Sequence, residues 1–155
     1  CLSSKWKFPM SIFSNPFRKS HLGEPVDLSL VGIDMHSHFI PGIDDGAKTM
    51  KDSIELLRGM EELGYRKVIT TPHVMGDFFR NTTEIITTGL EQLRNAAKAE
   101  GLEIEIDAAA EYYYDFDLET KINSGLLLTV GLDDLLFEVS YMNAPENLDA
   151  FIFLL

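Results

Sequence analysis

Two histidines separated by one residue are the first group in this sequence that could do chemistry. His36 and His38 end an apolar stretch that predicts a strand, and residues i and i+2 of an extended segment face the same side. Two imidazoles on one side form a bidentate metal site, whereas the alternative is a pair of surface histidines in a loop. Because the chain has only 4 histidines and three of them fall at predicted strand ends, we favour a metal site.

Other side chains that can bind a metal follow at short distance along the chain. Asp44 and Asp45 precede Gly46 and a predicted helix. For Asp44 we favour an N-cap or an Asx-turn, and for Asp45 the residues alone leave that role and a ligand role equally open. His73 follows Pro72 in a turn that leaves a predicted strand, where a lone histidine is more often structural.

Two glutamates extend this set. Glu111 follows three alanines, which allow close approach of another segment, and the alternative for it is an ordinary surface turn. Glu138 lies in the apolar segment 135–139, where a buried carboxylate is costly unless it is paired or bound to a metal. Its alternative is a solvated position at the same functional edge.

The elements that must position these residues alternate between strand and helix. Hydrophobic periodicity and capping residues predict strands at 28–35, 66–71, 102–109 and 132–139, and helices at 49–63, 83–100, 116–123 and 147–155. Such alternation favours a parallel sheet or barrel with helices outside. Each predicted strand has a residue that can bind a metal at its carboxyl end, and this is the edge at which α/β barrels carry their active sites.

Composition restricts the class of protein. A chain of 155 residues predicts one domain, and 45% hydrophobic with 25% charged residues is typical of a globular protein. The net charge of −12 argues against duplex nucleic acid and against a polybasic membrane surface. The single cysteine, Cys1, fits a reducing, cytoplasmic compartment, and no apolar stretch predicts membrane insertion.

The two ends of the chain carry separate expectations. Residues 1–27 are predicted to form an extended N-terminal arm, and residues 1–9 are expected to be additional to a natural start at Met10. Residues 28–155 are expected to form the N-terminal portion of one α/β domain that is truncated at its C-terminus, because the last predicted helix stops without a terminating residue.

Five segments, taken in order, resemble one protein superfamily. They are residues 34–38, 41–48, 70–73, 109–112 and 136–140. Together they resemble the PHP (polymerase and histidinol phosphatase) superfamily, and within it the bacterial manganese-dependent tyrosine-protein phosphatases of capsule and exopolysaccharide synthesis. The HSH and PGIDDGAK strings carry most of this specificity, and the match runs through residues 28–155.

The resemblance implies an α/β fold of a particular kind. This is a PHP-type distorted (βα)7 TIM-like barrel with two to three Mn²⁺ or Fe ions at its C-terminal face, of which the chain would hold about the first four βα units. His36 and His38 would bind the first ion, and Glu111 would bridge the first and second ions. Glu138 takes the position of a ligand to the second ion.

Two further ligands are also implied by the resemblance. Asp45 and His73 would hold the third ion and act as catalytic residues, which resolves the alternatives left open for both. Separately, Phe78, Phe79 and Arg80 lie just after His73, a position from which their side chains could contact the ring and the phosphate of a substrate. Arg80 is the substrate-binding candidate, and packing within the loop is at least as good an interpretation of the two phenylalanines.

The implied function is metal-dependent hydrolysis of phosphotyrosine in proteins. The expected substrate is the C-terminal tail of a tyrosine autokinase of capsule or exopolysaccharide synthesis. Hydrolysis of histidinol phosphate or another small phosphoester is one alternative, and a non-catalytic, truncated metal-binding module is another. The family's later HPER-like and Asp-x-His motifs have no counterpart here, so we expect the 155-residue chain alone to lack full activity and to self-associate.

Overall fold

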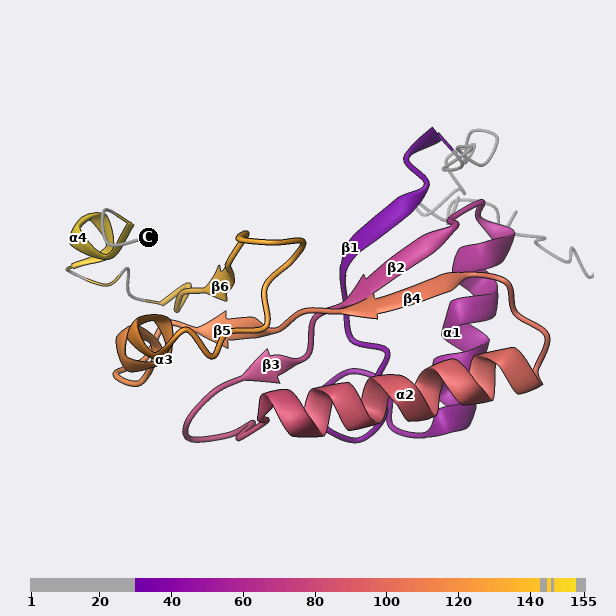
Figure 1. Ribbon diagram of the computed structural model, residues 1–155, viewed down its shortest axis with the longest axis horizontal. Coiled ribbons are helices and arrows are strands. Elements are labelled where there is room, and N and C mark those ends of the chain that lie inside the picture. Colours follow the sequence, from indigo (N-terminus) through magenta and orange to yellow (C-terminus); the bar gives the residue numbers. More distant parts are fainter. Residues whose placement is uncertain (1–29, 143–144, 146, 153–155) are drawn as a thin grey trace, which may run out of the picture.

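Strands and helices alternate through the part of the chain that the computed structural model describes, residues 30–142, 145 and 147–152 (Figure 1). The elements are β1 (Ile33–Ser37), α1 (Met50–Glu62), β2 (Lys67–Thr70), β3 (His73–Val74), α2 (Thr83–Ala99), β4 (Glu105–Ala108), β5 (Glu111–Tyr113), α3 (Leu118–Ser124), β6 (Leu136–Glu138) and α4 (Leu148–Ile152). The predicted arm, residues 1–27, lies outside the described residues.

The strands form two short parallel sheets, and the second begins where the strands of the first end (Figure 1). The first has the order β1-β2-β4 and the second the order β3-β5-β6. The segment between β2 and β3 is bonded to both sheets. Thr71 N donates to Ser37 O of β1 (2.6 Å), and Pro72 O accepts from Glu111 N of β5 (3.1 Å). The parallel α/β arrangement predicted from the sequence is therefore present. The seven-unit closed barrel remains a prediction.

The sequence-based prediction was wrong about the turn after β2. His73 was expected in that turn, and an ordinary surface turn was the alternative interpretation of Glu111, but each begins a short strand of the second sheet. Pro72 has no amide proton, so it interrupts the ladder after β2 before the chain re-enters at β3. After β4, Ala110 N donates to Leu128 O (2.9 Å) instead of to a neighbouring strand, and pairing resumes at Glu111.

Threonine caps start the two long helices close to the predicted positions, although for α1 the cap is not the predicted aspartate. Thr49 accepts from Asp52 N (3.2 Å) and Asp52 accepts from Thr49 N (2.9 Å), a capping box that begins α1. Thr82 accepts from Ile85 N (3.2 Å) at the start of α2. Both helices therefore begin one residue after a threonine, within one residue of the predicted starts.

Other boundaries differ from the prediction. The first strand covers 33–37 instead of 28–35, the third covers 105–108 instead of 102–109, and the third helix covers 118–124 instead of 116–123. The fourth strand is only Leu136–Glu138, because Val130 and Asp134 pair antiparallel and Leu132 is left 91% exposed. The last helix is described over Leu148–Ile152, and residues 153–155 lie outside the described residues.

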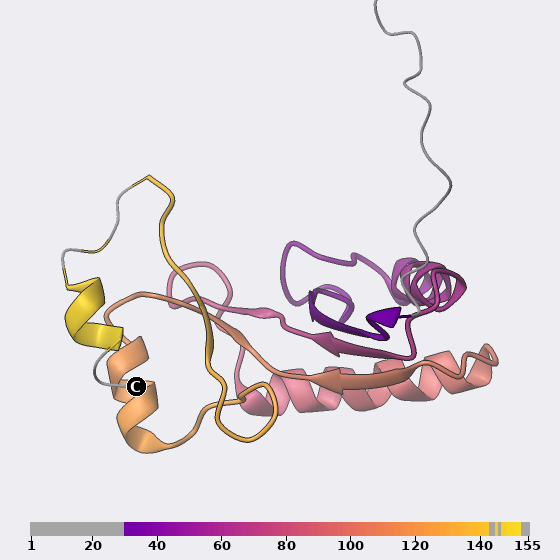
Figure 2. The same ribbon diagram turned by 90° about the horizontal axis from the view of Figure 1, so that it is seen from above.

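Packing of helices against the first sheet makes the main core. In Figures 1 and 2, α2 runs alongside β4, and it also contacts α1. Leu57 of α1, Leu93 of α2, Val68 of β2 and Ile106 of β4 are buried together. At the other end Phe151 of α4 contacts aromatic rings next to β5 and in β6. No helix within the described ranges is long and apolar enough to span a bilayer.

Candidate metal centre

Six side chains that can bind a metal converge where the first sheet passes into the second. They are His36 at β1, His38 just after it, Asp45 in the loop before α1, His73 at the start of β3, Glu111 at the start of β5 and Glu138 at the end of β6. His73 and Glu111 are register partners in neighbouring parallel strands. The structure thus brings together all six residues that the sequence analysis named as ligands.

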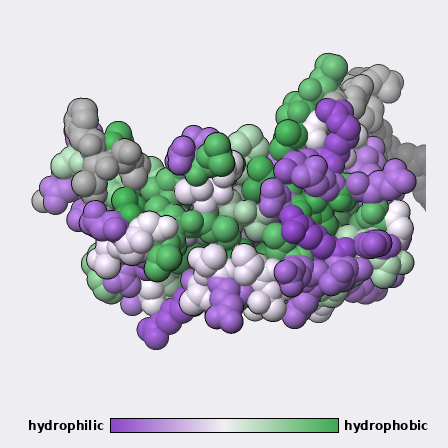
Figure 3. Space-filling view, in the orientation of Figure 1, coloured by the Kyte–Doolittle hydropathy of each residue, from purple (hydrophilic) through white to green (hydrophobic). Residues whose placement is uncertain are grey.

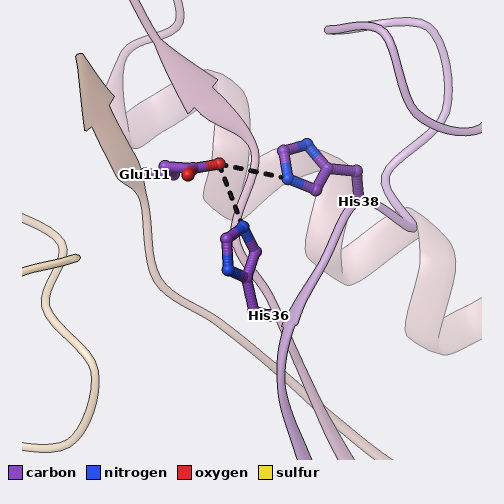
Figure 4. A group of neighbouring side chains, drawn as sticks. All are labelled: His36, His38 and Glu111. Carbon is purple, nitrogen blue, oxygen red and sulfur yellow. Dashed lines mark hydrogen bonds and ion pairs between the residues drawn. The ribbon is translucent and has the colours of Figure 1, made fainter. Parts of the chain in front are cut away.

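Glu111 lies at the centre of this group. Its Oε2 is 3.2 Å from His36 Nε2, 3.3 Å from His38 Nε2 and 3.4 Å from His73 Nδ1. Figure 4 shows the His36 and His38 rings directed at this carboxylate from the β1 segment. The Glu111 side chain is only 7% exposed, so a single buried oxygen faces three imidazole nitrogens.

The two other carboxylates lie on either side of His73. Asp45 Oδ1 is 3.6 Å from His73 Nε2, and Glu138 Oε2 is 3.9 Å from His73 Nδ1. The six residues form three overlapping groups with ligand atoms within 4.8 Å of one another: His36, His38 and Glu111; His38, Asp45 and His73; and His73, Glu111 and Glu138. Each group therefore shares members with the other two.

The residues fit bound cations. His73 Nδ1 is buried and has no hydrogen-bond partner, although it faces the carboxylates of Glu111 and Glu138. Imidazole nitrogen together with carboxylate oxygen is a donor set that binds transition-metal ions. Ligands at about 2.0–2.2 Å from one ion lie about 3 Å apart, close to the separations around Glu111.

Asp44 belongs to the site, although the sequence analysis favoured a local role for it. Its side chain is fully buried and lies 2.7 Å from His38 Nδ1 through Oδ2. Oδ2 also accepts from His73 N (3.1 Å), and Oδ1 accepts from Gly46 N (2.9 Å), which is the Asx-turn bond. The N-cap alternative was wrong because Thr49 caps α1.

These contacts shift two pKa values in opposite directions. The hydrogen bond to Asp44 raises the pKa of His38 above its usual value, and burial of the ring only partly opposes this. Burial would raise the pKa of Asp44, but the hydrogen bonds from His38 and from backbone amides outweigh it and hold that pKa below its usual value. The Asp44 carboxyl group is therefore ionised at neutral pH.

Two residues after β3 support His73 from outside the ligand set. Asn81 donates from Nδ2 to His73 O (2.8 Å) and to Ile43 O (3.0 Å), so it ties the Asp44 loop to β3. Phe79 stacks on the His73 ring at 5.6 Å between centroids and 11° between planes. The sequence analysis overlooked Asn81, for which the only local signal is a polar residue directly before the α2 cap.

The substrate candidates near His73 lie in a tight loop. Met75 and Phe79 form an antiparallel bridge, and Phe78 is 78% exposed. Arg80 is exposed, and its Nε donates to Gly76 O (2.8 Å) within the same loop. The binding role of Arg80 stays a prediction.

Comparison with known proteins agrees with this arrangement of residues. The model of the family described as "Capsular polysaccharide synthesis, CpsB/CapC" matches residues 32–150. The tyrosine-protein phosphatase CpsB of Streptococcus pneumoniae is 33% identical over 90 residues, which cover 58% of this chain and 37% of that protein. The tyrosine-protein phosphatase YwqE of Bacillus subtilis is 29% identical over 98 residues, which cover 63% of this chain and 39% of that protein.

A solved structure of such proteins also has a fold similar to that of this chain. It comes from work on YwqE from B. subtilis and CpsB from S. pneumoniae, described as metal-dependent tyrosine phosphatases. The superposition has a TM-score of 0.71 with 27% sequence identity, and covers 78% of this chain and 49% of that one. The chain thus spans less than half the length of these relatives. With most of its length matched by the family model, it belongs to the CpsB/CapC family of capsular polysaccharide synthesis proteins.

Proposed function

We propose that this chain provides metal ligands of a metal-dependent protein-tyrosine phosphatase. The observation that carries the proposal is the single buried oxygen of Glu111 within 3.4 Å of nitrogens from three histidines. Relatives from two bacterial genera are named tyrosine-protein phosphatases, and the matching structure is of metal-dependent ones. The chain's membership of their family supports the same activity here.

The three overlapping groups support a particular assignment of ligands. His36 and His38 bind the first ion, and Glu111 is shared between the first and second ions. Glu138 serves the second ion, while Asp45 and His73 serve the third. We propose Mn²⁺, or Fe, for two to three of these positions, because mixed imidazole and carboxylate sites suit such ions.

Divalent ions held here would lower the pKa of a bound water and polarise the phosphoryl oxygens of a substrate. The chain's own residues differ in exposure, and this suggests different roles. The side chains of Glu111 (7% exposed) and His73 (14%) are buried and fix the geometry of the site, whereas the Asp45 side chain is 69% exposed. Asp45 is therefore the ligand that incoming water meets first, and its carboxylate can accept a proton there.

The finer features of the function are proposed from the family resemblance. The substrate is a phosphotyrosine in the C-terminal tail of a tyrosine autokinase. From its position just after His73 in the sequence, and not from the resemblance, Arg80 is the candidate for contact with the phosphate. Residues 28–155 form part of a (βα)7 barrel that acts in the cytoplasm. The named role of the family in capsular polysaccharide synthesis supports a substrate in that pathway.

The proposal is tested by replacing the first two histidines together. Because the relatives are longer, the 155 residues are assayed both alone and within a chain of the relatives' length. We expect Mn²⁺-dependent hydrolysis of a phosphotyrosine peptide by the longer chain, and loss of turnover in His36→Ala/His38→Ala with an unchanged far-UV circular dichroism spectrum. The 155 residues alone are expected to turn over more slowly.

The control is Lys51→Ala/Glu55→Ala, which removes an exposed ion pair on α1 and should leave turnover unchanged. Full activity in the double histidine variant would contradict the metal assignment. Faster turnover of histidinol phosphate than of the peptide would instead favour a small-phosphoester hydrolase.

A further inference from the structure

Among the described residues, the Asp44 side chain has three hydrogen-bond partners, and all three are nitrogens. Oδ1 accepts from Gly46 N at 2.9 Å, while Oδ2 accepts from His73 N at 3.1 Å and lies 2.7 Å from His38 Nδ1. Backbone amides can only donate, and an ionised carboxylate can only accept. With the side chain fully buried, the short contact to the imidazole is satisfied only if Nδ1 carries the proton.

The proton on Nδ1 decides what the other ring nitrogen can do. A neutral imidazole has one proton, so Nε2 then keeps a free lone pair. His38 Nε2 is 3.3 Å from Glu111 Oε2, the same oxygen that lies 3.2 Å from His36 Nε2. By contrast, His38 Nδ1 is 3.9 Å from Asp45 Oδ1, so a free Nδ1 would face the group that contains Asp45 and His73.

We propose that Asp44 is a positioning residue that fixes His38 as the Nδ1–H tautomer and thereby commits its Nε2 to the ion shared with His36 and Glu111. This proposal rests on the proposed metal-dependent function. Hydrogen bonds from outer carboxylates orient histidine ligands and commonly contribute about 10–100-fold to metal affinity. Asp44 also holds the His73 backbone, so one buried carboxylate sets the relative position of two ligand-bearing segments.

Asp44→Asn is a sharp test because an amide cannot accept all the hydrogen bonds that the Asp44 carboxylate accepts. Asparagine offers one acceptor oxygen and one NH₂ group, but donors approach both oxygens of Asp44. If the amide oxygen keeps the Gly46 bond, the NH₂ faces His38 and His73 N. His38 Nδ1 must then accept, which moves the ring proton to Nε2 and places it toward Glu111.

Asn81→Ala is the matched control. Asn81 ties the same loop to β3 through Ile43 O and His73 O, so its Nδ2 donates to backbone oxygens and not to an imidazole. Its loss should lower thermal stability without changing the tautomer of His38. A purely structural role for Asp44 would make the two variants behave alike.

The experiment combines long-range ¹H–¹⁵N NMR of the histidine rings in the metal-free protein with calorimetric titration of Mn²⁺. The spectra are recorded at a pH above the raised pKa of His38, where its ring is neutral, and in the wild type we expect the Nδ1–H tautomer. In Asp44→Asn we expect Nε2–H and Mn²⁺ affinity lower by about 10–100-fold, whereas Asn81→Ala should keep the wild-type tautomer of His38.

An Nε2–H tautomer in the wild type would overturn the proposal, and so would an unchanged tautomer in Asp44→Asn, or the same change of tautomer in Asn81→Ala. If Asp44→Asn does not fold, the wild-type tautomer alone decides. Failure of the wild type to bind Mn²⁺ would refute the proposed function, whereas the NMR result would still test the role of Asp44.

Discussion

At the scale of single residues, Glu111 is the position on which the site depends most. A buried carboxylate is costly unless it is paired or bound to a cation, and Glu111 is a member of two of the three ligand groups. The alanines before it, Ala109 and Ala110, are fully buried, so the close approach expected from their small size is present. Glu138 belongs to one group only, and its side chain is 40% exposed.

This difference between the two glutamates predicts unequal effects on metal content. Glu111→Gln should remove two bound ions per chain, because the neutral amide weakens both groups that share it, and Glu138→Gln should remove one. Metal analysis after dialysis at a fixed free Mn²⁺ concentration measures this directly, with circular dichroism as the check on folding. Equal losses in the two variants would show that Glu111 does not bridge.

At the scale of elements, the loop between β1 and α1 is held from two sides. Thr49 caps α1 at the end of the loop, and Ile40, which is 1% exposed, packs beneath α2. A Cβ added at Gly89 of α2 would lie 2.5 Å from Ile40 Cγ2. Because Ile40 follows His38 by two residues, the packing of α2 helps to position a ligand.

Two glycine substitutions should therefore have opposite effects on stability. Gly59→Ala in α1 meets nothing within 4 Å and should raise the free energy of unfolding by about 1 kcal/mol through helix propensity. Gly89→Ala gains the same propensity but overpacks against Ile40 at a cost of about 1–3 kcal/mol, so we expect a net loss and weaker Mn²⁺ binding. Urea unfolding measures both, and equal stabilisation of the two variants would refute the packing argument.

At the scale of the whole molecule, the ligands tie together segments that are far apart in the sequence. Ions at the site would cross-link β1, β3, β5 and β6 in a chain with a net charge of −12. Because metal binds the folded state, its binding free energy adds to the free energy of unfolding. Removal of the metal should therefore weaken the entire fold and not only the site.

Chelation gives the corresponding measurement. Mn²⁺ at about 100 times its Kd stabilises the folded state by about 2.7 kcal/mol, which corresponds to an increase in Tm of roughly 5–10 °C for a chain of this size. A chelator should reverse this increase. The His36→Ala/His38→Ala variant is the control and should show a much smaller one; an equal increase in that variant would place the stabilising ion elsewhere.

The β1 end of the molecule carries exposed apolar surface. Val31 (62% exposed), Ile33 (44%) and Met35 (54%) lie in or before β1, which is an edge strand among the described residues. Figure 3 shows hydrophobic surface where the start of β1 lies in Figure 1. This surface is a physical basis for the expected self-association of the 155-residue chain, which light scattering would measure.

The sequence by itself determined the features that depend on neighbours along the chain. Alternating elements, helix starts at Thr49 and Thr82, and two imidazoles on one side of an extended segment all follow from short-range periodicity and capping. Recognisable strings around the ligands then identified the family. For these features the physical determinant lies within a few residues, so one sequence was enough.

Only the tertiary structure decided which of these groups meet. His36 and Glu111 are 75 residues apart, and Asp44 reaches His73 N across 29 residues. Such contacts are set by the register of parallel strands and by the path of the chain around Pro72, neither of which leaves a local pattern. For that reason the sequence and its family resemblance predicted the candidate ligands and a bridging role for Glu111, whereas the approach of three imidazole nitrogens to one Glu111 oxygen and the contact of Asp44 with His38 emerged only from the folded chain.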